Sequence, residues 1–146
     1  MKALIQRVSQ AQVNVNNETV GSINQGILAL IGVERDDTIE KAEQLLNKML
    51  RYRIFSDDAG KMNLSLNDIQ GELLLVSQFT LVADTKKGNR PGFSKGASPD
   101  HGTFIFNELV KLAQQTKLKI QTGQFGADMQ VSLTNDGPVT FWLETS

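Results

Sequence analysis

The alternation of hydrophobic and polar residues predicts several short strands in the first part of the chain. Residues 3–8 and 12–15 each alternate along their length, and residues 20–23 form a further short strand. The Asn16-Asn17 pair between the last two segments offers a turn. We therefore expect an antiparallel hairpin with one face exposed to solvent.

Two runs are hydrophobic on both faces and predict buried strands, at residues 27–33 and 72–82. The second run places Ser77, Gln78 and Thr80 at its C-terminal end. Buried polar side chains are costly unless they are hydrogen-bonded or face a cleft. Either this end faces a ligand cleft, as the carboxyl ends of strands in α/β sheets often do, or the strand reaches the surface there. The sequence leaves both interpretations open.

Two segments have helical spacing of hydrophobic residues and a recognisable start. Asp37, followed by Glu40, resembles a capping box and predicts a helix that ends at about Arg51 or Arg53. Ser98 as N-cap with Pro99 in the first turn predicts a second helix to about Lys117. Both helices are amphipathic, so we expect them to pack on the sheet.

The last third of the chain returns to strand patterns. A short strand is expected at residues 119–123, and residues 124–133 alternate so that the odd-numbered residues form a core face. A turn at residues 135–138, which contains Gly137-Pro138, then leads into a final strand at 139–143. The elements together predict an α/β (α+β) fold, with mostly antiparallel or mixed sheets in a barrel- or sandwich-like core and two amphipathic helices on it.

The composition limits the chemistry. At 146 residues the chain is expected to form one domain, residues 1–146. Its net charge of −1 creates no global attraction to nucleic acid or membrane.

The absence of cysteine excludes thiol nucleophiles and thiolate metal sites, and it suits a cytoplasmic location. No signal peptide is visible at the N-terminus. A single histidine, His101, argues against a multi-histidine metal centre.

The irregular segment 83–99 is the one basic stretch of the sequence. It carries four cationic residues against the single acid Asp84; they are Lys86, Lys87, Arg90 and Lys95. Loops longer than about 12–15 residues in compact domains are usually functional or disordered. Contact with phosphate or an RNA backbone is one interpretation, and a solvated loop is the other.

Two short motifs resemble the signature motifs of the D-aminoacyl-tRNA deacylases, formerly called D-tyrosyl-tRNA deacylases. They are Ser77-Gln78-Phe79-Thr80-Leu81 and Asn135-Asp136-Gly137-Pro138-Val139-Thr140. The resemblance extends nearly from end to end and includes residues 3–8, 52–57, 60–64 and 93–99. The motif positions show no departure from the family pattern.

This resemblance implies an enzyme that hydrolyses the ester bond of D-aminoacyl-tRNA and of mischarged glycyl-tRNA, without cofactor or metal. It implies a cytoplasmic homodimer in which a cis Gly137-Pro138 turn of one subunit enters the partner's pocket and rejects L-amino acids. The pocket would be lined by Ser77, Gln78, Phe79 and Thr80. Arg7, Met129 and Asn135 would support the site, and Lys86, Lys87, Arg90 and Lys95 would contact tRNA.

The residues alone leave the mechanism open. Thr80 is placed to be a nucleophile or to position water, but a nucleophilic hydroxyl needs an adjacent base and none is evident in the sequence. We therefore favour assistance by the neighbouring ribose hydroxyl of the tRNA. Taken by itself, His101 is expected to be a surface residue, and Arg7 an edge arginine that reaches water.

Two other functions are compatible with the sequence. One is a small-ester hydrolase that uses Ser77 or Thr80 with His101. The other is a dimeric RNA-binding module without catalytic activity.

Overall fold

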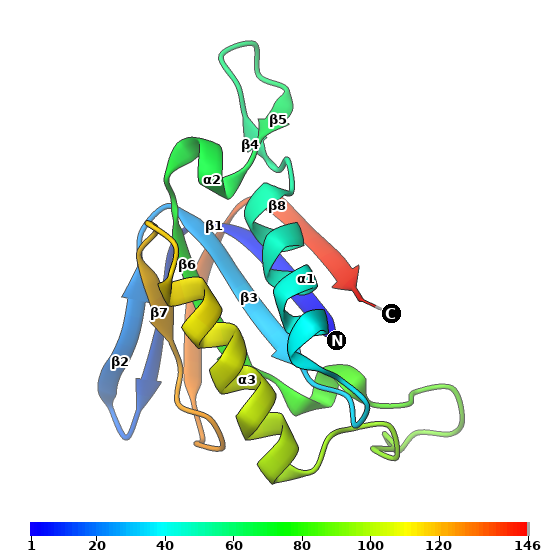
Figure 1. Ribbon diagram of the computed structural model, residues 1–146. Helices are drawn as coiled ribbons and strands as arrows, with labels where there is room; N and C mark the ends of the chain where they lie inside the picture. Colours follow the sequence, from blue (N-terminus) through cyan, green and yellow to red (C-terminus); the bar gives the residue numbers. More distant parts are fainter. Residues whose placement is uncertain (146) are drawn as a thin grey trace.

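A long first strand organises the sheet of this protein, whose computed structural model describes residues 1–145 (Figure 1). The strand, β1 (Lys2–Val15), pairs along one edge with β8 (Gln130–Glu144). Its other edge pairs first with β3 (Gly26–Gly32) and then with β2 (Glu18–Ile23). All three pairings are antiparallel, so the predicted hairpin at Asn16-Asn17 is confirmed.

The sheet becomes parallel beyond β3. β6 (Glu72–Ser77) lies beside β3, and β7 (Ile120–Thr122) lies beside β6. β2 also contacts β6 and β7, which curves the sheet into a nearly closed barrel. The mixed α/β architecture predicted from the sequence is thus confirmed.

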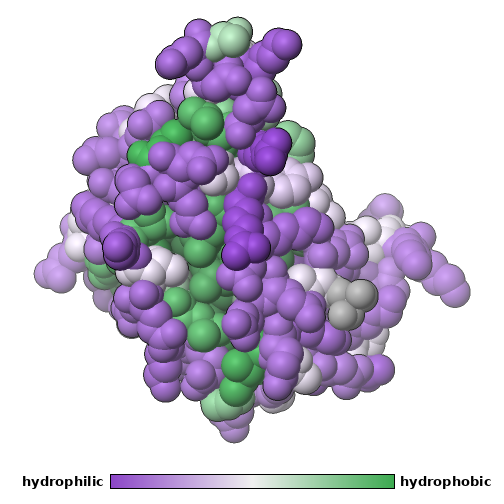
Figure 2. Space-filling view, turned by 45° about the horizontal axis from the view of Figure 1, so that its top comes forward, coloured by the Kyte–Doolittle hydropathy of each residue, from purple (hydrophilic) through white to green (hydrophobic). Residues whose placement is uncertain are grey.

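Two helices cover one face of this sheet, as Figure 1 shows. They are α1 (Ile39–Arg51) and α3 (Pro99–Gln114), and they contact each other as well as the sheet. Their hydrophobic residues join one large core with the helix-facing side of β1, β3 and β6. A smaller core, which includes Val8, Leu28 and Val76, forms on the opposite side. On the face seen in Figure 2, a band of hydrophobic residues reaches the surface between hydrophilic ones.

The remaining elements are short. A hairpin of β4 (Phe55–Ser56) and β5 (Met62–Leu64) projects from the body of the molecule (Figure 1). In its loop, the backbone N–H of Lys61 and the side chain of Asn63 donate to Asp57, and these bonds lower the pKa of that carboxyl group. Helix α2 (Leu66–Ile69), which the sequence analysis missed, has a complete capping box between Ser65 and Asp68. No helix within residues 1–145 has the length and hydrophobicity to cross a membrane.

Three predicted boundaries are wrong. The strand expected to extend to Val82 ends at Ser77, and a 3₁₀ helix, η1 (Phe79–Val82), follows it. A Cβ atom at Gly32 would lie 2.9 Å from Val82 and 3.0 Å from Leu81, so the chain folds back over a position that lacks a side chain. Residues 124–129 form a loop, in which Gly126 has a φ of +77°. The second helix ends at Gln114 instead of about Lys117.

The expected cap of the first helix is also wrong. Thr38 is the N-cap, and its hydroxyl accepts from the backbone N–H of Lys41. Asp37 is instead buried, with Oδ1 2.9 Å from the fully buried ammonium group of Met1 and Oδ2 accepting from the Glu34 N–H. The carboxylate therefore serves a long-range ion pair and leaves the capping role to the next residue.

Replacement of Asp37 by alanine should destabilise the fold by about 3 kcal/mol, because it leaves a buried charge with a weaker partner. Glu34 lies 3.5 Å from the Met1 ammonium and still pairs with it after the replacement. The loss is therefore expected at the lower end of the roughly 3–5 kcal/mol that breaking a buried ion pair costs. Urea unfolding measures the change. The control is Asp36→Ala, at a side chain that is 87% exposed, which should change stability by no more than about 0.5 kcal/mol. Equal unfolding midpoints for the two variants would contradict this account of Asp37.

Candidate active site

A pocket of about 530 Å³ opens at the carboxyl ends of β3 and β6. These strands are parallel neighbours, and Ile31 lies opposite Ser77 at their ends. Ser77 and Gln78 line the pocket, so the polar strand end does face a cleft. The full lining comprises Ile31, Val33, Val76, Ser77, Gln78, Phe79, Val82, Phe93, Gly96, Ala97, Ser98, Pro99, Gly102, Phe125, Gly126, Ala127, Met129 and Val131.

The predicted residues Gln78, Phe79 and Thr80 lie where β6 gives way to η1. Gln78 donates its backbone N–H to the Ile31 carbonyl, which ends the pairing with β3. Its side-chain amide donates to the Thr80 hydroxyl at 2.5 Å. Phe79 lies on the pocket rim, whereas Thr80 is exposed and is not part of the lining. The backbone N–H groups of Phe79 and Thr80 have no hydrogen-bond partner among residues 1–145.

The opposite wall of the pocket comes from the end of the basic segment and the start of α3. The Ala97 N–H donates to the Val33 carbonyl at 3.1 Å, and the Arg35 N–H donates to the Lys95 carbonyl at 3.0 Å. Ser98 caps α3 by accepting from the His101 N–H, as its sequence position predicts. The wall is therefore fixed by backbone bonds to the segment that follows β3.

The loop before β8 supplies a third wall. Residues 125–127, Met129 and Val131 line the pocket, so the odd-numbered face expected to be core forms part of a cleft instead. Met129 and Val131 also pack on the edge of the smaller core. A Cβ atom at Gly123 would lie 2.7 Å from the Met129 sulfur, so the bare glycine makes room for this side chain.

The Asn135–Pro138 segment is not a chain-reversing turn, in contrast to the expectation from the sequence. β8 pairs with β1 on both sides of it, since Val8 lies opposite Asn135 and Gln6 lies opposite Thr140. Residues 136–139 thus form a wide bulge opposite Arg7 alone. The Gly137-Pro138 peptide bond within the bulge is cis, and both residues are exposed.

Arg7 and Asn135 hold the bulge from two sides. The Arg7 guanidinium donates to the Asp136 carbonyl at 2.7 Å and to the Ile54 carbonyl at 2.8 Å. With only 13% of its side chain exposed, Arg7 is not the water-reaching edge residue that its pattern alone suggested. Asn135 accepts from the Val139 N–H at 2.7 Å and donates to the Thr140 hydroxyl at 3.0 Å.

Within one chain, the bulge and the pocket are separate. Arg7 pairs with Ile27, which pairs with Leu73, four residues before Ser77 on β6. Four residues along a strand span roughly 13 Å, and β1 and β3 lie between β8 and β6. Neither Gly137 nor Pro138 lines the pocket of its own chain.

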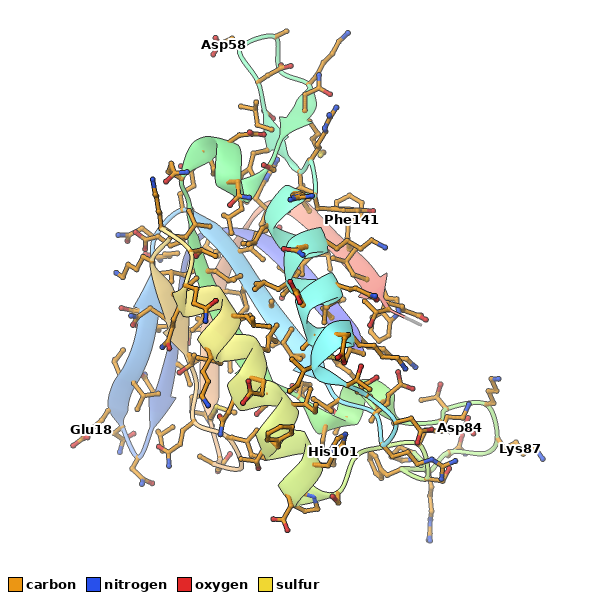
Figure 3. All side chains as sticks on the ribbon, in the orientation of Figure 1. Glu18, Asp58, Asp84, Lys87, His101 and Phe141 are labelled. Atoms are coloured by element: carbon orange, nitrogen blue, oxygen red, sulfur yellow. The ribbon has the colours of Figure 1, made fainter. Side chains whose placement is uncertain are left out.

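The four basic residues and His101 are not part of the pocket lining. Figure 3 shows Lys87 on a loop that projects from the body of the molecule. Lys86, Lys87 and Arg90 belong to a loop closed at its base by two backbone hydrogen bonds between Asp84 and Gly92. Lys95 is separate from them and lies beside residues 34–36. His101 contacts the Asp37 carbonyl through Nε2 at 2.8 Å. No group of three or more histidine, aspartate or glutamate residues suited to a metal ion occurs in the described chain.

The family model described as "D-Tyr-tRNA(Tyr) deacylase" matches residues 4–144. The chain belongs to this family. A D-aminoacyl-tRNA deacylase of Haemophilus influenzae (strain 86-028NP) is 62% identical over 143 residues, which cover 98% of this chain and 99% of the relative.

Two solved structures are also similar. One, the "c-Myc DNA Unwinding Element Binding Protein", has a TM-score of 0.94 and 40% identity, and the match covers 100% of this chain and 99% of the other. A "probable eukaryotic D-amino acid tRNA deacylase" has a TM-score of 0.82 over 97% of both chains, and at 18% identity it shares the fold.

Sequence reasoning missed two aromatic residues of the deacylase-family pocket. Phe93 lies in a segment that resembles the family but that predicts no role for it, and the alternation of residues 124–133 predicts Phe125 in the core. Both lie in glycine-containing loops, where neither strand nor helix periodicity applies. An apolar aromatic residue within a basic, polar segment was the one available signal for Phe93.

Replacement of Asn135 by alanine should loosen the bulge, because the Val139 N–H loses its acceptor. One such hydrogen bond corresponds to roughly tenfold faster exchange of the Val139 amide hydrogen. Asn135→Asp keeps an acceptor but loses the bond donated to the Thr140 hydroxyl. The exchange rate of the Val139 amide should therefore fall between those of the unmodified protein and Asn135→Ala. NMR-detected hydrogen exchange measures this, with the exposed helical Asn47→Ala as control. Unchanged exchange at Val139 in Asn135→Ala would show that Asn135 does not hold the bulge.

Proposed function

We propose that this protein hydrolyses the ester bond of D-aminoacyl-tRNA and releases free tRNA and the D-amino acid. One observation carries the proposal: the Ser77–Phe79 part of the family motif lines a pocket that is apolar on most sides and polar at the strand end. An amino-acid side chain suits the apolar walls, and the ester suits the polar end. The reaction would act as proofreading during translation in the cytoplasm.

Backbone groups would stabilise the charge that develops during hydrolysis. The N–H groups of Phe79 and Thr80 have no hydrogen-bond partner among residues 1–145; Phe79 lines the pocket, and Thr80 directly follows it. One donor of this kind contributes about 10²–10³ in rate when it is preorganised for an oxyanion. An aminoacyl ester is already prone to hydrolysis, so positioning and oxyanion stabilisation would suffice.

The Thr80 hydroxyl lacks an activating base. It accepts a hydrogen bond from Gln78, and the ring of His101 is bonded to the Asp37 carbonyl. A nucleophilic hydroxyl needs a base that takes its proton. We therefore assign the assisting role to the ribose 2′-hydroxyl of the tRNA, and to Gln78 and Thr80 the role of shaping the polar end.

Chiral selection would come from the bulge of a second subunit. Gly137 and Pro138 are exposed, and the bulge is remote from the pocket of its own chain. Arg7 fixes the Asp136 carbonyl, and Asn135 fixes the Val139 N–H. In a homodimer, Gly137 and Pro138 would enter the partner's pocket and leave no room for an L side chain. Glycyl-tRNA, which has no side chain to exclude, would also be a substrate.

Positive charges beside the pocket would bind the tRNA backbone. Lys86, Lys87 and Arg90 are exposed, and none of them takes part in an ion pair within residues 1–145. Lys95 would contribute from its separate position. Such contacts weaken as salt concentration rises.

Hydrolysis of D-tyrosyl-tRNA but not of L-tyrosyl-tRNA is the central prediction. Steric exclusion by a fixed backbone should produce at least a hundredfold difference in kcat/KM, which is about 2.7 kcal/mol of transition-state free energy. Release of radiolabelled tyrosine measures both rates. Equal hydrolysis of the two esters would contradict the filter. Binding without release would favour an RNA-binding module, and loss of activity in His101→Ala would favour the alternative hydrolase.

The Thr80→Ala variant should retain activity within about tenfold, because losing one neutral hydrogen bond costs only about 1 kcal/mol. A D-tyrosyl-tRNA whose terminal adenosine lacks the 2′-hydroxyl should instead lose most of its hydrolysis by the unmodified enzyme. Single-turnover rates separate chemistry from product release. An inactive Thr80→Ala enzyme together with an active deoxy substrate would make Thr80 the assisting group.

A further inference from the structure

Two phenylalanine rings lie against each other at the mouth of the pocket. The centroids of Phe79 and Phe93 are 5.3 Å apart, with ring planes tilted by 46°. Phe79 is 69% exposed and Phe93 is 42% exposed, although both contribute atoms to the pocket lining. Both rings are therefore open to solvent at the mouth of the pocket, and Phe79 is the more exposed of the two.

The aromatic pair lies at the base of the basic loop. Phe79 begins η1, which leads directly to Asp84, and Phe93 follows Gly92 at the other end of the loop. Because Asp84 and Gly92 are joined by two backbone hydrogen bonds, the two rings are held on one side of the loop base. Figure 3 places Asp84 near this base and Lys87 at the far end of the loop.

The surface beyond the rings is cationic. The loop carries three cations, Lys86, Lys87 and Arg90, and one acid, Asp84. The Asp84 carboxylate accepts a hydrogen bond from the Lys86 backbone N–H. A ligand that leaves the pocket here meets two exposed aromatic rings and then three positive charges. Stacking rings combined with a cationic surface are the features by which proteins bind single-stranded nucleic acid.

We propose that Phe79 and Phe93 form a stacking platform for the unpaired nucleobase that precedes the terminal aminoacylated nucleoside of tRNA. The inference rests on the proposed function, in which the amino acid and its ester lie in the pocket, so that the terminal nucleoside lies at its mouth. The preceding base then lies outside the pocket, against the exposed rings. Its phosphate lies toward Lys86, Lys87 and Arg90.

Nucleic acid fits this surface better than a second copy of the chain. A symmetric contact of this surface with the same surface of a second copy would bring identical cations together, whereas an RNA backbone neutralises them. The site also lies beside the pocket that takes the 3′ end of the substrate. Stacking would not select a particular base, because every base has a face that can stack.

A fluorescent cytosine analogue tests the platform. Pyrrolocytosine, which loses fluorescence on stacking, is placed at the penultimate position of a D-tyrosyl-tRNA whose amide linkage resists hydrolysis. Binding to the unmodified enzyme should quench the fluorescence. Phe93→Leu should lose at least half of the quenching and raise the Kd about tenfold, since a leucine side chain cannot stack. Phe93→Tyr should restore both.

The matched control is Phe104→Leu, at an exposed phenylalanine of α3 that does not line the pocket, and it should behave as the unmodified enzyme does. With the ester substrate, Phe93→Leu should raise KM more than it lowers kcat. Equal quenching by the unmodified and Phe93→Leu enzymes would overturn the platform. So would a change of oligomeric state in Phe93→Leu with unchanged quenching, which would assign the rings to an interface between copies. Hydrolysis of ordinary D-tyrosyl-tRNA, measured in parallel, shows separately whether the proposed function holds.

Discussion

The two hydrogen bonds of the Arg7 guanidinium connect the parts of this structure that would otherwise be independent. One bond fixes the Asp136 carbonyl in the β8 bulge, and the other fixes the Ile54 carbonyl at the base of the β4–β5 hairpin. A guanidinium presents its donors in a rigid planar fork, which a lysine ammonium cannot reproduce. Since β8 is paired with β1 on both sides of the bulge, the position of Arg7 on β1 determines where the backbone protrudes.

The pocket depends on a second constraint, which is the end of pairing between β3 and β6. The last bond, from the Gln78 N–H to the Ile31 carbonyl, releases the chain into η1 over the bare Gly32. The same turn exposes Phe79 and leaves two N–H groups without partners. The end of pairing at Gln78 thus determines both the shape of this side of the pocket and the position of the Phe79 and Thr80 N–H donors. The opposite wall is fixed by backbone hydrogen bonds to the segment after β3.

The sequence predicted those features that depend on neighbouring residues. The hairpin at Asn16-Asn17, the Ser98-Pro99 helix start and the buried strand from Gly26 are set by local pattern and were confirmed. The Asp37 cap was wrong because a distant ammonium group binds that carboxylate. The extension of β6 to Val82 was wrong because the hydrophobic pattern continues after the pairing partner ends.

The candidate site shows the same division. The polar residues Ser77 and Gln78 at the end of a hydrophobic run raised the possibility of a cleft, and the sequence left it open beside a strand end at the surface. Phe93 and Phe125 gave no such indication, because loops carry no periodicity. The sequence predicts a turn at the position of the bulge because glycine and proline are typical of both turns and bulges. A bulge is distinguished from a turn here only by the strand pairing, in which Val8 lies opposite Asn135 and Gln6 lies opposite Thr140. This register depends on two strands, so the pattern of one segment cannot reveal it.

A site built in this way relies on backbone geometry more than on reactive side chains. The Thr80 hydroxyl is bonded to Gln78, and the one imidazole is bonded to a backbone carbonyl. Among residues 1–145, the backbone groups without a hydrogen-bond partner include the N–H donors of Phe79 and Thr80 beside the pocket. In the proposed reaction, the substrate ester is labile and its own ribose hydroxyl assists, so the protein has only to orient the substrate and stabilise developing charge. Glycine, proline and hydrogen-bonding residues suit that task, because they determine the path of the main chain.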